Sequence, residues 1–414
     1  MKHFTEPRSN RFRIAVRKYQ PFETAIRAQW EAFEMKVHSG LTLDLVPLEL
    51  PALEDALFTS KGMASGEWDT CFIPTDWIAS MYAQKCAVDL LPLLENEPPN
   101  DYPEGWHPSL LRLQRIKETI LGVPYHDGPE CLIYRRDLFE DRDTRDKFRR
   151  RFDRKLTVPR TWAEFHTIAR FFQDPRRHLY GAAFAAFPDR HNSIYDFLLQ
   201  LWTRGGDLTT PSGDLLFSST EAESALNFYR NILSDDLAVH PDCRQFDSVA
   251  AGRHFAAGEI AMMINWFGFA LLAHTSEDSV ARGFVDVAKI PSNSGFRSIS
   301  LNVYWILSIA IGSPHRELSW QFLCHTLTPA MDRLTTASGA IGCRRSTWND
   351  AGINERIPFY RRIELLHDHA REIPQRDDWP KVAAIIDRLV TSAITTSEPT
   401  RYLLRAADES YAQL

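Results

Sequence analysis

The sequence lacks the long apolar segment that a membrane-spanning helix needs. Its longest apolar stretches, Ala261–Ala273 and Val303–Ile311, are interrupted or too short, because a bilayer requires about 20 residues. A strong positive charge is also absent, since the formal net charge is -6 and the pI is about 6.2. These absences predict no membrane span and no nucleic-acid partner.

Cysteine is sparse and widely spaced, with no CxxC pair that would suggest a zinc or redox site. Most of the cysteines stand in apolar surroundings, which favours plain buried thiols. The even number also permits disulfides, so the sequence leaves the disulfide state open. The cysteines are Cys71, Cys86, Cys131, Cys243, Cys324 and Cys343.

Several enzyme motifs are missing as well. The chain contains no G-x-S-x-G elbow, no phosphate-binding G-x-x-x-x-G-K-[ST], no G-x-G-x-x-G and no H-E-x-x-H. A metal site is one interpretation of His367 and His369. In a helix, however, residues two apart face different directions, which favours a solvated helix. The sequence therefore predicts no enzyme, no cofactor and no metal.

The composition is that of a soluble globular protein, with 44% hydrophobic and 25% charged residues. A chain of 414 residues is too long for one ordinary core. Two domains, each with its own apolar interior, are the expected organisation.

Strand-like and helix-like patterns alternate along the first part of the chain. Phe12–Val16 predicts a strand, and Pro21–His38 predicts a long helix because apolar residues recur every three or four positions. Leu41–Val46 and Trp68–Ile73 predict further strands, with helices after them. This order is typical of βαβ units, and it predicts an α/β fold with a parallel sheet and helices on both faces.

The middle of the chain continues this alternation. Glu130–Arg135, Gly181–Phe187 and Ile260–Asn265 predict strands. Four helices are predicted between or beside them, each beginning with a Ser or Thr that can cap the first turn. These helices are Thr161–Phe172, Ser193–Thr203, Ser219–Leu233 and Ser248–Ala257.

Taken in order, six segments resemble the family 1 extracellular solute-binding proteins, the group that includes maltose-binding proteins. The likeness depends on their order and spacing over almost the whole chain, because each alone is short. The segments are Trp68–Ile73; Gly122–Tyr125 with Leu132–Phe139; Val158–Phe165; Phe255–Met262 with Asn265 and Trp266; Ile306–Ile311 with Glu317 and Trp320–Leu323; and Ile373–Gln375 with Trp379. The loop Gly339–Arg344 lacks a proline that the family often has, so no ligand role is assigned to it.

This resemblance implies a type II periplasmic-binding-protein-like fold, with two lobes, a hinge and a ligand cleft between the lobes. Lobe 1 is expected to comprise residues 1–127 and about 297–345, and lobe 2 about residues 128–292. Residues 346–414 are expected to form helices that pack mainly on lobe 2. The strand crossovers would lie near His126–Pro129 and Ser292–Arg297.

The resemblance also implies a function: a monomeric substrate-binding component of an ABC importer that delivers a small solute, a mono- or oligosaccharide, to membrane permease subunits. The family's location is periplasmic or extracellular. The first ten residues, MKHFTEPRSN, lack the apolar core of a secretion signal, so a cytoplasmic location stays open. The alternatives are a cytoplasmic ligand sensor on the same fold or a carbohydrate-active enzyme.

Sugar chemistry suggests which residues would bind such a ligand. Aromatic rings cover the apolar faces of a sugar, and charged or amide side chains bind its hydroxyls. Candidates fall mostly just after predicted strands, although helix caps, turns and core packing are alternative roles for each. One of Tyr304 and Trp305 is expected in the core. The predicted ligand-binding residues are Lys18, Tyr19, Thr75, Asp76, Trp77, Tyr125, His126, Asp127, Trp202, Asn265, Trp266, Tyr304, Trp305 and Trp379.

Overall fold

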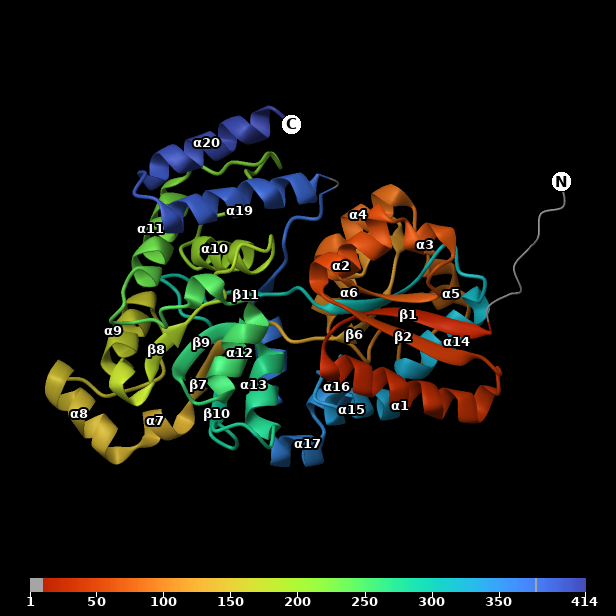
Figure 1. The fold of residues 1–414 in the computed structure, drawn as a ribbon, viewed down its shortest axis with the longest axis horizontal. Helices are drawn as coiled ribbons and strands as arrows, with labels where there is room; N and C mark the ends of the chain where they lie inside the picture. The colour runs from red at the N-terminus through yellow and green to blue at the C-terminus, as the bar shows by residue number, and fades with distance from the viewer. Residues whose placement is uncertain (1–9, 377) are drawn as a thin grey trace. The chain divides into compact units, whose positions relative to one another are not determined.

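The fold was analysed in a computed structural model, which describes residues 10–376 and 378–414. Contacts between Cα atoms divide the chain into two compact units (Figure 1). Unit 1 comprises Met1–Asp127, Val303–Asn354 and Ile373–Asp377, and unit 2 comprises Gly128–Asn302, Glu355–Glu372 and Asp378–Leu414. The chain therefore passes between the units at several points, two of which are Asp127/Gly128 and Asn302/Val303.

Unit 1 is built around a five-stranded sheet in the order β2-β1-β3-β12-β6. Strands β1, β2 and β3 run parallel, whereas β12 runs antiparallel to both β3 and β6. The prediction of parallel pairing is therefore confirmed for the three strands from which it was made. The sheet as a whole is mixed, because β12 enters it from a distant part of the chain and in the opposite direction. The strands are β1 (Arg11–Arg17), β2 (Thr42–Leu48), β3 (Thr70–Pro74), β6 (Val123–His126) and β12 (Trp305–Ile309).

Helices cover both faces of this sheet (Figure 1). On one face Phe12 stacks on Trp30 of α1, with ring centroids 4.7 Å apart, and meets the edge of Phe322 of α14 at 5.9 Å. These rings are buried and join the sheet to both helices. The helices of unit 1 are α1 (Gln20–Val37), α2 (Leu50–Glu54), the π-helix η1 (Asp55–Thr59), α3 (Gly62–Ser65), the 3-10 helix η2 (Thr75–Trp77), α4 (Ile78–Gln84), α5 (Leu91–Asn96), α6 (Pro108–Leu113), α14 (Arg316–Thr326), α15 (Pro329–Ala337) and α16 (Arg345–Trp348).

The Trp-Asp pair before β3 has a structural role. The Asp69 carboxylate accepts hydrogen bonds from the backbone N–H of Arg13 at 2.8 Å and from the Ser313 hydroxyl at 2.6 Å, and it lies 3.1 Å from Nδ1 of His315. A buried carboxylate needs such partners. Asp69 thereby ties the amino end of β3 to β1 and to the segment that leads into α14.

Unit 2 contains a four-stranded sheet in the order β10-β7-β9-β8. Strand β7 pairs antiparallel with both β9 and β10, and β8 pairs parallel with β9. The sheet is mixed here too. Its strands are β7 (Glu130–Arg135), β8 (Tyr180–Ala183), β9 (Ile260–Trp266) and β10 (Val285–Ala288). Strand β7 coincides with its prediction, whereas β8 ends well before the predicted Phe187.

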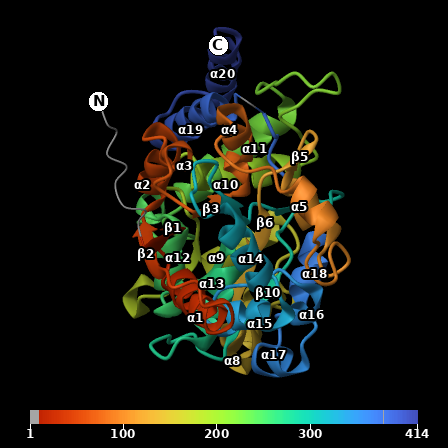
Figure 2. The same cartoon turned by 90° about the vertical axis from the view of Figure 1, so that its right-hand side faces the viewer.

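The helices of unit 2 form two groups. Helices α9, α12 and α13 pack on the sheet, while α10, α11, α19 and α20 pack on one another. In both views α20 lies outermost over α19 (Figures 1 and 2). The helices are α7 (Arg136–Glu140), α8 (Arg142–Phe152), α9 (Trp162–Phe172), η3 (Pro175–Arg177), α10 (Asn192–Trp202), α11 (Thr220–Leu233), η4 (Cys243–Gln245), α12 (Ser248–Ala256), α13 (Phe267–Thr275), α18 (Arg362–His367), α19 (Trp379–Thr395) and α20 (Thr400–Ala412).

The remaining elements are short. Strands β4 (Arg115–Ile116) and β5 (Thr119–Ile120) form a hairpin, and β11 (Ser300–Leu301) pairs with β13 (Ala370–Arg371). Helix α17 (Ala351–Arg356) crosses the boundary at Asn354/Glu355, where the chain passes from unit 1 to unit 2.

The predicted helix caps are correct at two of the four helices. Thr161 forms a capping box with Glu164, and the Ser219 side chain accepts from the N–H of Ala222. Ser193 and Ser248 are not caps. Asp247 caps α12, and the Asp189 carboxylate accepts from the first N–H groups near α10. Aspartate is as good a cap as serine, so the preceding carboxylate takes the position.

The described residues contain no helix long and apolar enough to cross a membrane. The six cysteines are free thiols, and all except the half-buried Cys324 are buried. The prediction of plain buried thiols is thus confirmed.

Candidate functional site

The carboxyl ends of β1, β3 and β6 meet the amino end of β12 at one edge of the sheet in unit 1, here called the unit 1 edge. Trp305, the first residue of β12, pairs with Pro74 at the end of β3 and with His126 at the end of β6. Ligands of open α/β sheets bind at this kind of edge. Most of the predicted ligand-binding residues in this unit lie here.

Aromatic rings gather at the unit 1 edge. Phe22 of α1 lies at the centre of the group, with ring centroids 5.0 Å from Tyr19, 4.7 Å from His126 and 5.7 Å from Trp305. Phe22 is buried, whereas Tyr19, His126 and Trp305 are half-buried. The edge therefore presents partly exposed rings that are supported from below by a buried one.

His126 is held as a neutral imidazole. Its Nδ1 accepts a hydrogen bond from the backbone N–H of Ile341 at 2.9 Å, so the ring proton belongs on Nε2. Burial lowers the pKa of His126 to about 4, with a smaller opposing effect from Asp127. His126 thus links the end of β6 to the loop before α16.

Tyr125 and Tyr304 point into the core of unit 1. The Tyr125 hydroxyl donates to Oε1 of Gln29 at 2.8 Å, and the Tyr304 hydroxyl donates to the carbonyl of Leu110. Burial raises the pKa of Tyr125. Of the two neighbouring rings at positions 304 and 305, Tyr304 is the core residue and Trp305 is the one with an exposed part.

Thr75, Asp76 and Trp77 form η2 directly after β3, and all three are buried. The Thr75 hydroxyl accepts from the N–H of Tyr304 at 3.2 Å, and the Thr75 N–H donates to the Tyr304 carbonyl at 2.9 Å. Trp77 meets the edge of Phe58 at 5.8 Å. The Thr75 hydroxyl therefore joins β3 to the start of β12 and does not cap the next helix.

Two more predicted residues of unit 1 differ in exposure. Lys18 follows β1 and is exposed, with its Nζ 3.2 Å from Oε1 of Glu49 after β2. Asp127 follows β6 and is buried, and its N–H donates to the carbonyl of Ile341 at 3.1 Å. Lys18 is therefore an exposed side chain paired with Glu49, whereas Asp127 is held beside the Ile341 loop.

In unit 2 the amino end of β7 meets the carboxyl end of β9, here called the unit 2 edge, where Glu130 pairs with Trp266. The half-buried Trp266 ring meets the edge of Tyr195 from α10, with centroids 5.6 Å apart. The Tyr195 hydroxyl lies 2.8 Å from Nδ1 of His191. Trp266 is thus a supported, partly exposed ring.

Asn265 is buried and positions its neighbour. Its Nδ2 donates to the Ser248 carbonyl at 2.9 Å, and its Oδ1 accepts from the Trp266 N–H at 2.8 Å. Asn265 therefore joins the end of β9 to the start of α12 and fixes the backbone that carries Trp266.

Glu130 at the unit 2 edge and the nearby Asp196 of α10 are two buried carboxyl groups, and neither was predicted from the sequence. Burial raises the pKa of Asp196 to about 8, although the Tyr229 hydroxyl donates to it at 2.6 Å. Burial, with the nearby Asp196 charge, raises the pKa of Glu130 well above its ordinary value. A carboxyl kept neutral in this way can donate a hydrogen bond. The available signal was a single acid in the otherwise apolar pattern of α10.

The two remaining predicted tryptophans are almost fully buried within unit 2. The guanidinium of Arg371 covers the ring of Trp202 at 4.7 Å and is paired with Asp207 at 2.5 Å. Trp379 begins α19 and is 5% exposed. Their presence in a ligand site stays a prediction.

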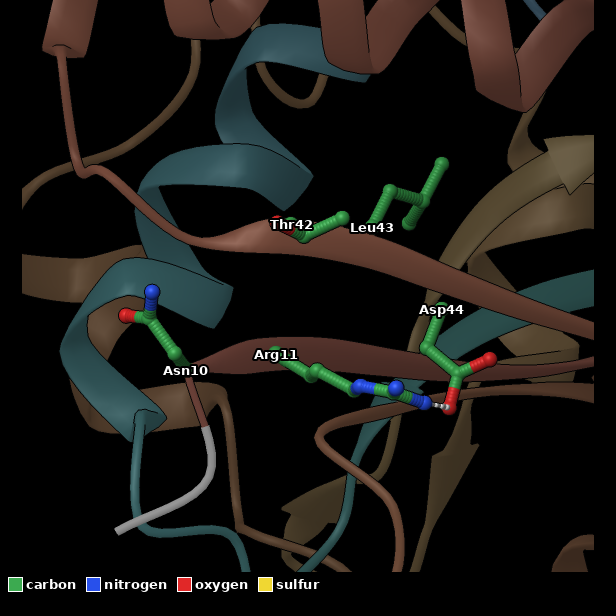
Figure 3. A pocket seen from close by; sticks show the side chains of 5 residues that line it. All are labelled: Asn10, Arg11, Thr42, Leu43 and Asp44. Atoms are coloured by element: carbon green, nitrogen blue, oxygen red, sulfur yellow. Dashed lines mark ion pairs between the residues drawn. The ribbon is translucent and has the colours of Figure 1, made fainter.

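A hollow of about 340 Å³ in unit 1 is lined by Asn10, Arg11, Thr42, Leu43 and Asp44. Figure 3 shows Arg11 reaching towards Asp44, with which it forms an ion pair at 3.6 Å. This hollow lies at the amino ends of β1 and β2 and contains none of the predicted residues, so we assign no ligand to it.

Among the described residues, a cluster that could hold a metal ion consists of His240, His254 and Glu259 in unit 2. The histidine pair singled out in the sequence, His367 and His369, is a different one. Helix α18 ends at His367, which is buried, and His369 accepts from Nζ of Lys289 at 2.8 Å. The expectation of a solvated helix there is therefore wrong.

Residues 18–331 match the family model of the bacterial extracellular solute-binding proteins. Maltose-bound MalE3 of T. maritima has a TM-score of 0.84 and 21% identity, covering 98% of this chain and 100% of that one. A solute-binding protein of Agrobacterium radiobacter K84 in complex with ribitol has a TM-score of 0.83 and 19% identity, covering 99% and 100%.

A third similar structure is the maltose/maltodextrin-binding domain MalE of Bdellovibrio bacteriovorus bound to maltotriose. Its TM-score is 0.77 at 15% identity, and the match covers 97% of this chain and 99% of that one. At such identities the structural likeness shows the fold. The fold predicted from the sequence, a two-lobed α/β fold of the type II periplasmic-binding kind, is thereby confirmed.

Proposed function

The chain belongs to the family of bacterial extracellular solute-binding proteins, and we propose that it captures a small sugar or polyol for an ABC importer. In this proposal the ligand binds between the two units, against the unit 1 edge and the unit 2 edge. Family membership is consistent with a binding protein and not an enzyme.

The observation that carries the ligand class is the pair of supported aromatic groups. Tyr19 and Trp305 at the unit 1 edge and Trp266 at the unit 2 edge are half-buried, and each packs against another ring. A sugar or polyol has apolar C–H surfaces that such rings can cover. Rings held from behind lose little conformational freedom when a ligand binds.

Hydroxyl groups of the ligand would need polar partners as well. Glu130 pairs with Trp266 in the sheet, and Oε2 of Glu130 is buried without a hydrogen-bond partner among the described residues. We propose that the neutral Glu130–Asp196 pair supports the polar side of the ligand site. A neutral carboxyl suits an uncharged ligand better than a carboxylate, because no uncompensated charge is then buried.

The similar structures were obtained with maltose, ribitol and maltotriose bound. This range contains sugars and a linear polyol, so we extend to this chain only the shared class, a neutral polyhydroxylated molecule.

Hinge closure is the proposed means of capture. The chain passes between the units at Asp127/Gly128, and Gly128 has φ 137, a backbone conformation that glycine adopts most readily. Hinges are commonly a few residues that absorb such backbone changes. A closed state would gain contacts to the ligand from both units, and that difference in affinity would shift the equilibrium towards closure.

We propose further that the protein acts outside the cytoplasmic membrane, as the family's extracellular description implies, and that it delivers its ligand as a monomer to permease subunits. Cell fractionation tests the location. A protein found only in the cytosol would instead support the alternative of an intracellular ligand sensor.

Isothermal titration calorimetry of the purified protein with maltose, maltotriose and ribitol tests the ligand class, with an amino acid and a polyamine as controls. We expect one site per chain for at least one of the three polyhydroxylated ligands. Binding of only a control ligand would refute the proposed class. Chromatography of the incubated sugar would reveal turnover, which would favour the enzyme alternative.

A further inference from the structure

His240, His254 and Glu259 come together in unit 2 from three different segments. His240 lies between α11 and η4, and its N–H donates to the carbonyl of Ala182 in β8 at 2.9 Å. His254 lies on α12, and Glu259 stands in the turn between α12 and β9. The backbone of Glu259 is fixed on both sides, because its N–H donates to the His254 carbonyl at 3.1 Å and its carbonyl accepts from Tyr180 at 2.7 Å.

The potential ligand atoms of these three side chains all lie within 4.8 Å of one another. Nδ1 of His254 is 2.5 Å from Oε2 of Glu259, and the two imidazole centroids are 5.0 Å apart. Two ligands of a tetrahedral metal ion lie about 3.3 Å apart. Side-chain rotations that move the ligand atoms by about an ångström would therefore place all three around one ion.

Neighbouring rings hold both imidazoles in place. Phe246 stacks on His254 with centroids 4.5 Å apart, and Tyr180 meets the edge of His240 at 4.2 Å. Fixed ligand rings reduce the entropy lost when a metal binds. The site also has a route to solvent, because the His254 and Glu259 side chains are 37% and 35% exposed while His240 is buried.

We propose that His240, His254 and Glu259 form a site for a divalent transition-metal ion such as Zn²⁺, with water at the remaining position. Two imidazole nitrogens and one carboxylate oxygen match the ligand preference of zinc and its neighbours, and they do not suit Ca²⁺ or Mg²⁺, which favour all-oxygen sites. This site is independent of the proposed solute site.

Metal binding must compete with two existing interactions. Nδ1 of His240 accepts a hydrogen bond from the backbone N–H of Asp242 at 3.1 Å. A metal at Nδ1 would replace this bond. A metal at Nε2 would move the ring proton to Nδ1, where it opposes the Asp242 N–H. The contact between His254 and Glu259 must also open from hydrogen-bond to metal-ligand spacing. We therefore expect micromolar binding that weakens in acid, where the ligands are protonated.

The test is calorimetric titration of the full-length, EDTA-treated protein with Zn²⁺ and, separately, with Mg²⁺. The variants are His254→Gln and Glu259→Gln, which keep a polar side chain at each position. His166→Gln is a matched control, because His166 also contacts a carboxylate, Asp235 at 2.6 Å, outside this cluster. Melting temperatures in EDTA establish that each variant is folded.

We expect the wild type and His166→Gln to bind one Zn²⁺ per chain, and the two cluster variants to bind it at least tenfold more weakly. Zn²⁺ should also raise the melting temperature of the wild type and of His166→Gln but not that of the cluster variants. Absence of Zn²⁺ binding in the wild type would overturn the proposal. Unchanged binding in both folded cluster variants would also overturn it, since the ion would then lie elsewhere.

Discussion

The unit 1 edge and the unit 2 edge both present half-buried rings, but they support those rings differently. At the unit 1 edge Trp305 packs on Phe22 and stands in the sheet between two strands. At the unit 2 edge Trp266 is the last residue of β9 and meets Tyr195 edge-on. The first ring is therefore supported by a buried ring of α1 and by strands on both sides, whereas the second is supported by a ring of α10.

One ionisable group near each edge is kept neutral by burial, a histidine in unit 1 and an aspartate in unit 2. Burial lowers the pKa of His126 at the unit 1 edge to about 4 and raises the pKa of Asp196 behind the unit 2 edge to about 8. In each case the surrounding protein disfavours the charged form. Protonation of His126 in acid should therefore destabilise unit 1, and ionisation of Asp196 in alkali should destabilise unit 2. The neutral forms of both groups suit a site for an uncharged ligand.

The largest expected effect is a difference in the stability that the protein loses when Trp305 or Trp266 is replaced by alanine. Trp305→Ala removes a ring that packs on Phe22 and Phe72, so we expect it to lower the free energy of unfolding by about 2–4 kcal/mol. Trp266→Ala should cost about 1 kcal/mol or less, because its ring ends a strand and is partly exposed. Denaturant unfolding of both unliganded variants measures the difference, and equal losses would remove the contrast between the edges.

The next largest effect is a fall in the free energy of unfolding as the pH rises, caused by Asp196. Because the folded pKa of Asp196 lies above its ordinary value of 3.8, the folded state holds this proton more tightly than the unfolded chain, and stability should fall as the pH rises from about 4 to about 8. Asp196→Asn removes that titration. We expect the variant to gain about 1–3 kcal/mol relative to wild type between pH 5 and pH 8. A constant difference between the two proteins over this range would contradict the neutral Asp196.

A smaller effect of opposite sign is expected for His126. Its folded pKa of about 4 lies below its ordinary 6.5, so its contribution to stability is present above about pH 6.5 and is lost as the pH falls towards 4. His126→Asn keeps an acceptor near the Ile341 N–H without the titration. We expect it to recover about 1–2 kcal/mol relative to wild type between pH 7 and pH 5. Equilibrium unfolding at both pH values measures this, and identical pH dependence of the two proteins would argue against it.

Local patterns predicted much of the fold. The residues of β7 and the capping box of Thr161 and Glu164 follow from periodicity and cap chemistry within a few residues. The direction of β12 did not follow, because its partners β3 and β6 are far from it in the sequence. The caps of α10 and α12 were misplaced because an earlier aspartate accepts from the first N–H groups, Asp189 near α10 and Asp247 directly before Ser248.

The candidate site was predicted only in part for the same reason. Residues after strands were found because strand ends are visible in the sequence, but whether a ring faces inwards depends on tertiary packing, as Tyr304 and Trp305 illustrate. Glu130 and Asp196 are far apart in the sequence, and His240 and His254 lie on either side of η4, so each pair meets only through the tertiary fold of unit 2. No spacing rule could have joined them.

The most direct test of the account is to titrate one ligand, the sugar or polyol that wild type binds, against Trp305→Ala and Trp266→Ala. If the ligand lies between the units, each variant should bind it at least tenfold more weakly, because each removes a ring contributed by a different unit. Unchanged affinity in either folded variant would contradict a site shared by the unit 1 edge and the unit 2 edge.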